Sequence, residues 1–241
     1  MHGNRVMSGL ENAQMPQVNR LLDCLSQDEF DRLSPHLRQR PLRSKQALFR
    51  QGQTVQEIIF PGGGVYSLVK TMESGHSIEV MGVGAEGAIG ACVMLGQAES
   101  ATDVIVQVPD EAALSLPLDV FKSELEERGA LCASVTAYCS TFARQLMHAS
   151  ACNALHLAEQ RCCRWLLTTD DRVHGAGFPF THEMLASSLG VRRPTVTFIL
   201  AELQRAGVVE YGRGALLKVL DRPALEAKAC ECYRALSPSR G

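Results

Sequence analysis

Long apolar runs are missing from this chain, and so is an apolar segment at its start. No stretch of the 241 residues approaches the ~20 apolar residues that a membrane-spanning helix needs, so we expect no membrane association. Residues 1–6 lack the apolar core of a signal peptide. Nine cysteines without an export signal are typical of free thiols in a reducing compartment. The sequence therefore predicts a cytoplasmic protein.

Familiar catalytic patterns are missing as well. The chain shows no nucleophile motif and no phosphate-binding loop, so we do not expect an enzyme. Its 46% hydrophobic and 21% charged residues are typical of a globular protein, and its length suits two domains.

An overall excess of one charge is also missing, because the formal net charge is −2. The distribution along the chain is nevertheless uneven. Residues 181–222 carry a net +2 and residues 223–241 a further +1, which leaves −5 on the first 180 residues. Because a phosphate backbone attracts basic surfaces, we expect nucleic-acid binding only in the C-terminal third.

Residues 181–206 predict two short helices joined at a glycine. Leu185, Ala186 and Leu189 form the apolar stripe of the first helix, and Gly190 can adopt a positive φ and end it. The stripe of the second helix consists of Val196, Ile199, Leu200 and Leu203. This pattern is typical of a helix-turn-helix unit.

Hydrogen-bond donors gather at the start of the second helix, where such units place the side chains that read base edges in the major groove. The candidate DNA-binding residues are Thr181, Arg192, Arg193, Pro194, Thr195, Thr197, Phe198 and Arg213. Phe198 could contact a thymine methyl or turn into the core, and the sequence leaves both open. An ordinary helical hairpin with a solvated arginine pair is the alternative interpretation.

The following residues predict a wing. Residues 207–211 and 215–220 are expected to form two short strands around a glycine turn, with Arg213 at its tip against phosphate. Asp221 is a good N-cap for a last helix, which tolerates Pro223 in its first turn. Helix, turn, helix and wing together indicate a domain that binds duplex DNA.

The first two thirds of the chain have a different texture. After a tail of residues 1–16, residues 17–39 look helical, with a capping box of Ser26 and Glu29. Residues 46–117 contain six or more short β-prone runs separated by glycines, which predicts a small antiparallel sandwich or roll. A short helix is expected at residues 118–127.

One long helix is predicted at residues 130–157, because its apolar residues recur every three or four positions. We interpret this stripe as the seam of a homodimer, and a helix packed on its own domain is the alternative. The seam residues are Leu131, Val135, Tyr138, Phe142, Leu146 and Ala149.

A roll, a long helix and a winged helix-turn-helix, in this order, resemble the cyclic-AMP receptor protein and fumarate–nitrate regulator (CRP/FNR) family of bacterial transcription regulators. The resemblance covers about residues 20 to 235 and is most specific at residues 82–96, 180–213 and 221–226. It implies an α+β fold and a homodimer that binds double-stranded DNA and RNA polymerase. The implied parts are an N-terminal antiparallel β-roll sensor domain, cyclic-nucleotide-binding-like, at residues 17–128, a dimerisation helix at 129–157 and a C-terminal winged helix-turn-helix at 158–241.

Two parts of the family pattern differ here. Nucleotide-binding members hold the ribose and phosphate with a Gly-Glu pair and an Arg, where this chain has Gly90, Ala91 and Ala101. Losing the acid and the arginine argues against cyclic AMP, so the effector is unknown and no cofactor is required. The candidate effector pocket is Gly90, Ala91, Ala101, Thr102, Met147 and His148. Pro194 and Phe198 replace the usual base-reading residues, so a different target sequence is expected.

Cysteines and histidines suggest another kind of sensor. Iron–sulfur members of the family carry a cysteine cluster near the N-terminus, and such a cluster needs about four thiolates. This chain has only Cys24 there, so an iron–sulfur sensor is not expected. The candidate haem or metal ligands, spaced four residues apart on one helix face, are His148, Cys152 and His156. Cys162-Cys163 and Cys230-x-Cys232 lack the spacing of a zinc site. Thiol-based redox sensing and buried, inert thiols are the alternatives.

A cupin-like enzyme is the remaining alternative, since cupins share the roll. Metal cupins place two or three His and a Glu inside it, whereas residues 46–117 contain only His76, with Glu79 three residues later. One pair of side chains does not make a catalytic site.

Overall fold

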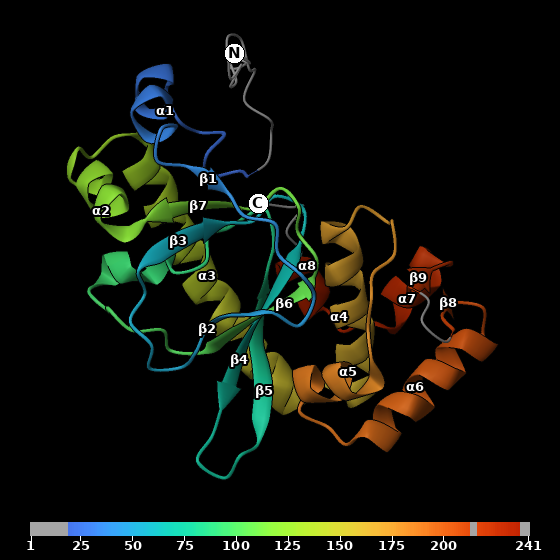
Figure 1. Ribbon diagram of the computed structural model, residues 1–241. Helices are drawn as coiled ribbons and strands as arrows, with labels where there is room; N and C mark the ends of the chain where they lie inside the picture. The colour runs from blue at the N-terminus through green and yellow to red at the C-terminus, as the bar shows by residue number, and fades with distance from the viewer. Residues whose placement is uncertain (1–18, 213–215, 237–241) are drawn as a thin grey trace, which may run out of the picture.

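Two β-sheets, whose strands are interleaved along the chain, come first and are followed by a long helix and a C-terminal helical unit (Figure 1). The computed structural model describes residues 19–212 and 216–236. The predicted tail at residues 1–16 and the predicted phosphate contact Arg213 lie outside these ranges. Within them, no helix is both long and apolar enough to cross a bilayer.

The N-terminal half contains the predicted antiparallel strands. One sheet has the order β1-β7-β3 and the other the order β2-β6-β4-β5. The strands are β1 (Arg38–Gln39), β2 (Ala47–Phe49), β3 (Glu57–Phe60), β4 (Val65–Thr71), β5 (Ser77–Val83), β6 (Asp103–Val108) and β7 (Leu114–Pro117). Phe60 of the first sheet and Tyr66 of the second are fully buried in one shared core. The sequence prediction of a β-roll is confirmed.

The first helix is shorter than predicted. Only α1 (Gln27–Leu33) is helical, because residues 38–39 pair with β7 instead of continuing the helix. The predicted capping box is present, since the Ser26 side chain accepts from the Glu29 amide at 3.3 Å. Glu29 also accepts from the Leu131 amide at 3.1 Å, so its carboxylate caps the start of the long helix.

The long helix α3 (Ala130–Leu155) buries the stripe that we interpreted as a dimer seam. Leu131 and Val135 are completely covered, and Phe142 and Ala149 are less than a tenth exposed. Tyr138 and Leu146 are partly buried against the same core. The stripe packs on its own chain, against α2 (Leu118–Glu126), β5 and the 3₁₀ helix η1 (Ala91–Leu95). The seam assignment is therefore wrong for these side chains.

A second stripe runs along the opposite, outward face of α3. Its members are spaced alternately four and three residues apart, which is the spacing of a coiled-coil seam. They are small or flexible, and all are exposed, with Met147 71% exposed. The outward stripe is Ala133, Ala137, Ser140, Arg144, Met147, Ala151 and Ala154.

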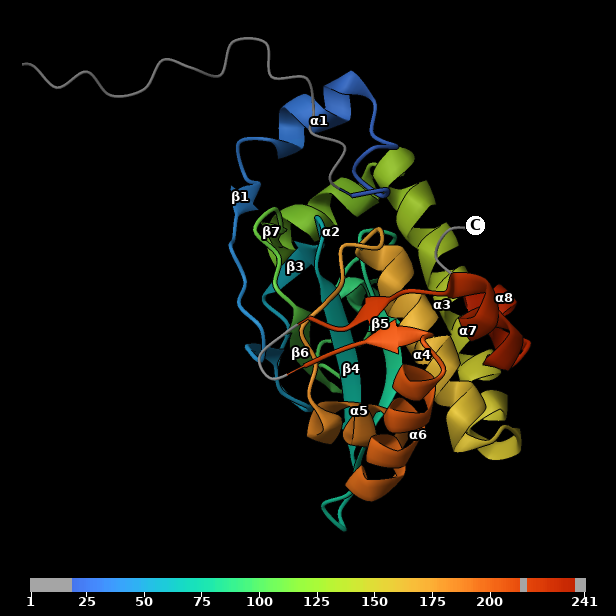
Figure 2. The same ribbon diagram turned by 90° about the vertical axis from the view of Figure 1, so that its right-hand side faces the viewer.

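The C-terminal part is a helical unit with a small hairpin. It contains α4 (Ala158–Arg172), α5 (His182–Leu189), α6 (Arg193–Arg205), β8 (Val209–Glu210), β9 (Lys218–Val219), α7 (Arg222–Lys228) and α8 (Cys232–Leu236). The predicted N-cap is confirmed, because the Asp221 side chain accepts from the Ala224 amide at 3.0 Å. Strands β8 and β9 pair as the wing, with Val209 opposite Val219. Figure 2 shows α6 and this hairpin on the side turned to the viewer.

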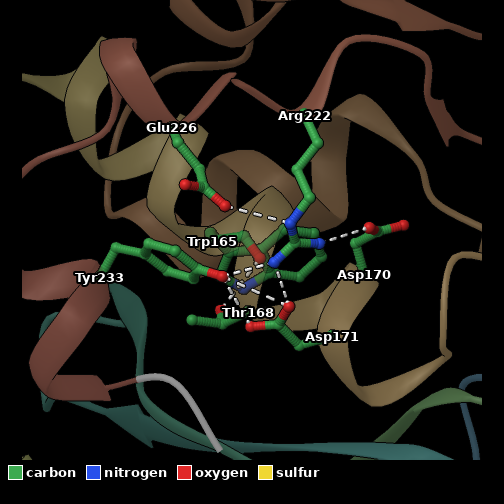
Figure 3. A network of polar contacts seen from close by, with 7 residues as sticks. All are labelled: Trp165, Thr168, Asp170, Asp171, Arg222, Glu226 and Tyr233. Atoms are coloured by element: carbon green, nitrogen blue, oxygen red, sulfur yellow. Dashed lines mark hydrogen bonds and ion pairs between the residues drawn. The ribbon is translucent and has the colours of Figure 1, made fainter. Parts of the chain in front are cut away.

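Arg222 ties the start of α7 to the end of α4 (Figure 3). Its guanidinium bonds to Asp170 at 3.1 Å, to Asp171 and to Glu226 at 3.1 Å. The Tyr233 hydroxyl of α8 donates to Asp171 at 3.0 Å and accepts from Arg222. Burial raises the pKa of Asp170, and the charge of Arg222 opposes this rise. The network thus joins α4, α7 and α8 within the C-terminal unit.

Glu79 of β5 is the polar centre of the junction between the roll and the C-terminal unit. Its carboxylate accepts from the Trp165 indole at 3.0 Å and from the Ser188 hydroxyl at 2.9 Å. Ser67 on the neighbouring strand donates to it at 2.5 Å. One carboxylate thus holds α4 and α5 on the sheet. A cavity of about 30 Å³ beside it has room for a single water molecule.

A buried ion pair completes this junction. The Arg172 guanidinium at the end of α4 donates to Glu86 at 2.8 and 2.9 Å and to the Gly82 carbonyl at 2.9 Å. The two side chains are 7% and 17% exposed. Although burial raises it, the pKa of Glu86 is lowered overall by the charge and hydrogen bonds of Arg172. An ion pair therefore connects α4 of the C-terminal unit to the roll.

Candidate nucleic-acid interface

Gly190 makes the turn between α5 and α6. It has a φ of +63°, and its amide donates to the Ser187 carbonyl at 3.2 Å. The next amide, of Val191, donates to Ala186 at 3.0 Å, so the end of α5 is closed as predicted. A Cβ at Gly190 would lie 2.8 Å from Ile78 of β5. The turn thus touches the sheet that contains β5 as well as needing a positive φ.

Helix α6 is packed on one side and free on the other. The predicted stripe Val196, Ile199, Leu200 and Leu203 is buried against α5 and the hairpin. Arg192 is the N-cap and Pro194 lies in the first turn. The exposed residues at this end are Arg192, Arg193, Pro194, Thr195, Thr197 and Phe198. In Figure 1 the helix forms an outer edge of the molecule, with its exposed side turned away from the other described elements.

Phe198 faces solvent, since it is 67% exposed. This excludes the alternative that it belongs to the core. A large exposed aromatic side chain on the same free face as two arginines suits apolar contact with a base methyl.

His182 and Thr197 form a contact that sequence reasoning missed. The Thr197 hydroxyl donates to the Arg193 carbonyl at 3.1 Å and lies 3.1 Å from His182 Nδ1. Burial and the nearby Arg193 charge lower the pKa of His182. The Thr197 hydroxyl is therefore already engaged within the protein, which leaves Thr195 and the arginines as the donors for a ligand.

An aromatic cluster links the wing to α5. The Tyr211 ring lies 5.4 Å from Phe180 and 5.8 Å from His182, in edge-to-face geometry. Gln204 of α6 donates to the Tyr211 carbonyl at 3.1 Å. The wing is held in a fixed place beside α6 by these contacts. Aromatic residues at 180 and 211 could have suggested the cluster, but their pairing depends on the tertiary fold.

Thr181 is the N-cap of α5. Its side chain accepts from the Met184 amide at 3.1 Å, and the residue is exposed. The hydroxyl hydrogen of such a cap remains able to donate to phosphate at a helix start.

The six candidate effector residues do not line the junction cavity. Ala91 is buried in the core of the roll, and a Cβ at Gly90 would lie 3.1 Å from Val55. Met147 is exposed on the outward stripe of α3, and Ala101, Thr102 and His148 reach the surface at least in part. Lys70 donates to the Ala101 carbonyl at 3.1 Å, a basic side chain that sequence reasoning did not bring to this place.

The thiols fall into separate environments. Cys152 and His156 meet Cys230 and Cys232 at the end of α3, whereas His148 is exposed and outside this group. The predicted trio is thus corrected. Nearer the middle of α3, the Cys139 thiol donates to Met94 Sδ at 3.6 Å. Its interaction with exposed Cys92 lowers the pKa of Cys92 to about 7, although burial opposes this.

The cupin alternative gains no support from the two residues it needed. His76 Nδ1 lies 3.1 Å from the Ser74 hydroxyl in an exposed turn. Glu79 is occupied by Ser67, Trp165 and Ser188 at the junction. The two side chains do not converge on one metal position.

Comparison with known proteins agrees with this geometry. Residues 160–228 match the family model of the Crp-like helix-turn-helix domain. A search of curated proteins found no significant match. A transcriptional regulator of the CRP family from Thermus thermophilus is similar in structure, with a TM-score of 0.66, 18% identity and coverage of 79% of this chain and 96% of that chain.

FixK2 from Bradyrhizobium japonicum is also similar, with a TM-score of 0.65, 14% identity and coverage of 80% and 98% of the two chains. The c-di-GMP-responsive regulator CLP from Xanthomonas campestris is similar as well, with a TM-score of 0.62 and 15% identity. The match covers 81% of this chain and 99% of that chain. At these identities the likeness establishes the fold. The resemblance to the CRP/FNR family is confirmed for the helix-turn-helix domain and for the overall fold.

Proposed function

We propose that the protein is a homodimeric transcription regulator that reads duplex DNA with α6. The observation that carries this proposal is the exposed, basic start of α6 on a helix whose other side is fully packed. RNA polymerase is proposed as a further partner, and we assign no catalytic step to the protein.

The proposed DNA contacts follow from where each side chain lies. Arg193 and Thr195 reach toward base edges, and Phe198 toward a thymine methyl, because all three are exposed on the free face of α6. Arg192 precedes the helix and Thr181 caps α5, so both suit phosphate contacts. Arg213, outside the described residues, is assigned to phosphate at the wing.

The dimer is proposed to form through the outward stripe of α3. This stripe has coiled-coil spacing and small side chains, which allow two helices to approach closely. Two copies would present two α6 helices, as a site with paired half-sites requires. The buried stripe cannot serve this purpose because it packs on its own chain.

Replacing Arg193 with Ala should weaken binding to a selected duplex by about 1–3 kcal/mol and relax the choice at one base pair. Fluorescence anisotropy with a duplex selected from a random pool, and with an unrelated duplex, measures this. Arg205→Ala is the matched control, because Arg205 lies at the other end of α6 in an exposed ion pair with Glu202. An equal loss on both duplexes would show that Arg193 does not read bases.

The effector is proposed not to be cyclic AMP bound in the manner of the family. Ala91 supplies no hydroxyl acceptor, and it is 1% exposed. Lys70 near Ala101 offers one charge but cannot replace the missing acid. We expect calorimetry to show no saturable heat with millimolar cyclic AMP or cyclic GMP. A micromolar dissociation constant for either nucleotide would mean that the cassette is wrongly aligned.

Thiol oxidation is a second candidate for the signal. The specific observation is that Cys92 is exposed and interacts with the Cys139 thiol, which lowers the pKa of Cys92. Its partner Cys139 lies on α3, so a change at Cys92 would act directly on the helix that carries the proposed dimer stripe.

A further inference from the structure

Four metal-ligating side chains from two distant segments meet at the end of α3. Cys152 and His156 are one helical turn apart there, and Cys230 and Cys232 flank the turn between α7 and α8. Cys152 Sγ lies 3.5 Å from Cys230 Sγ, and Cys232 Sγ lies 3.6 Å from His156 Nδ1. All four ligand atoms lie within 4.8 Å of one another.

These distances fit a tetrahedral zinc ion. Zinc–sulfur bonds of about 2.3 Å and zinc–nitrogen bonds of about 2.0 Å place tetrahedral ligand atoms about 3.5–3.8 Å apart. The two ligand pairs at 3.5 and 3.6 Å match this spacing. A disulfide would instead need sulfurs about 2.05 Å apart. We propose that Cys152, His156, Cys230 and Cys232 bind a structural Zn²⁺ ion.

The surroundings favour a closed site. Cys152, Cys230 and Cys232 are 0%, 4% and 7% exposed, and the His156 side chain is 21% exposed. Four protein ligands without an open position are typical of structural zinc rather than catalytic zinc. His156 Nε2 lies 4.0 Å from a Glu231 carboxylate oxygen. A carboxylate on the other ring nitrogen orients a metal-bound histidine in many sites.

A cation stands beside the four ligands. Three thiolates and a neutral imidazole around Zn²⁺ leave one negative charge. Arg164 of α4 acts electrostatically on Cys230 and favours its thiolate form. This positive charge opposes the net negative charge of the proposed site.

Binding would release protons and join two parts of the chain. The three thiols lose their protons to solvent as three zinc–sulfur bonds form, and no electron is transferred. The imidazole contributes its Nδ1 lone pair. The bound ion would fasten the turn between α7 and α8 to the last turn of α3. It would thus connect the C-terminal unit to the helix that carries the outward stripe.

Cobalt substitution tests the site in the full-length protein. After reduction and removal of metal with a chelator, Co²⁺ is titrated without oxygen. We expect one Co²⁺ per chain, with the intense visible bands of tetrahedral cobalt and a thiolate charge-transfer band. Zn²⁺ should displace it and release protons. Cys230→Ser and His156→Gln should each lower the affinity at least about tenfold.

The controls lie on the same helix. His148→Gln and Cys132→Ser, both on α3 and outside the cluster, should leave affinity and spectrum unchanged. His156 lies at the rim of the site, so its variant keeps the test valid if Cys230→Ser fails to fold. Weak octahedral cobalt bands, or an affinity unaltered in His156→Gln, would overturn the proposal. So would a native Cys152–Cys230 disulfide that persists when zinc is supplied.

Discussion

Met147→Glu is expected to convert the proposed dimer into a monomer. Met147 is 71% exposed within one chain and lies in the outward stripe of α3, so the protomer should fold normally. In the dimer, two new carboxylates would lose water in a seam of small side chains, with only Arg144 of the same stripe near them. Because desolvating a charge costs several kcal/mol, we expect the dissociation constant to rise at least about 100-fold. Sedimentation velocity measures the change. Affinity for a two-half-site duplex should fall with it.

Two matched variants separate the outward stripe from the inward one. Thr141→Glu, exposed on α3 but to the side of the stripe, should leave the dimer intact. Phe142→Glu should instead destabilise the protomer, because Phe142 is 8% exposed and packs in the core of its own chain. If Met147→Glu sediments as an unchanged dimer, the outward stripe is not the interface.

Arg172→Met should lower the free energy of unfolding by about 3–5 kcal/mol at neutral pH, because it leaves the Glu86 carboxylate buried without its partner. The Gly82 carbonyl loses a donor at the same time. Urea unfolding measures the loss. Arg205→Met, which breaks an exposed pair with Glu202, should change stability by less than about 1 kcal/mol. A similar loss of unfolding free energy in both variants would show that the buried ion pair stabilises the fold no more than an exposed one.

The pH dependence of this variant has a definite sign. In the wild type the folded pKa of Glu86 is lowered, so its ion pair stabilises the fold above the unfolded pKa of about 4.3 and is lost as the pH falls through the folded pKa. Without Arg172, burial raises the pKa of Glu86. The variant should then recover stability as acid protonates Glu86, and the gap to wild type should narrow at acidic pH.

Local patterns predicted the parts that local forces decide. The turn at Gly190, the cap at Asp221 and the capping box at Ser26 each depend on residues a few positions apart. The stripe of α6 also came out correctly, because only one of its faces is apolar. Alternation between glycine and β-prone runs was enough for an antiparallel roll, since short strands joined by tight turns pair with their neighbours.

Helix α3 marks the limit of this reasoning. Both its faces carry the four-and-three spacing of a coiled-coil seam, one with large residues and one with small residues. Spacing alone does not say which face the rest of the chain will cover. The face with large apolar side chains such as Leu131 and Phe142 packs in the core. Burying this face against the roll removes more apolar surface from water than burying the face with small side chains would.

The helix-turn-helix, the wing and the order of the domains were determined by the sequence alone, because short-range periodicity, capping and glycine positions specify them. Only the tertiary structure decided the exposure of Phe198, the junction at Glu79 and the thiol cluster at Cys152. Each of these brings together segments far apart in the chain. Contacts between distant segments depend on how whole helices and sheets pack, and the spacing of residues along the chain does not specify that packing.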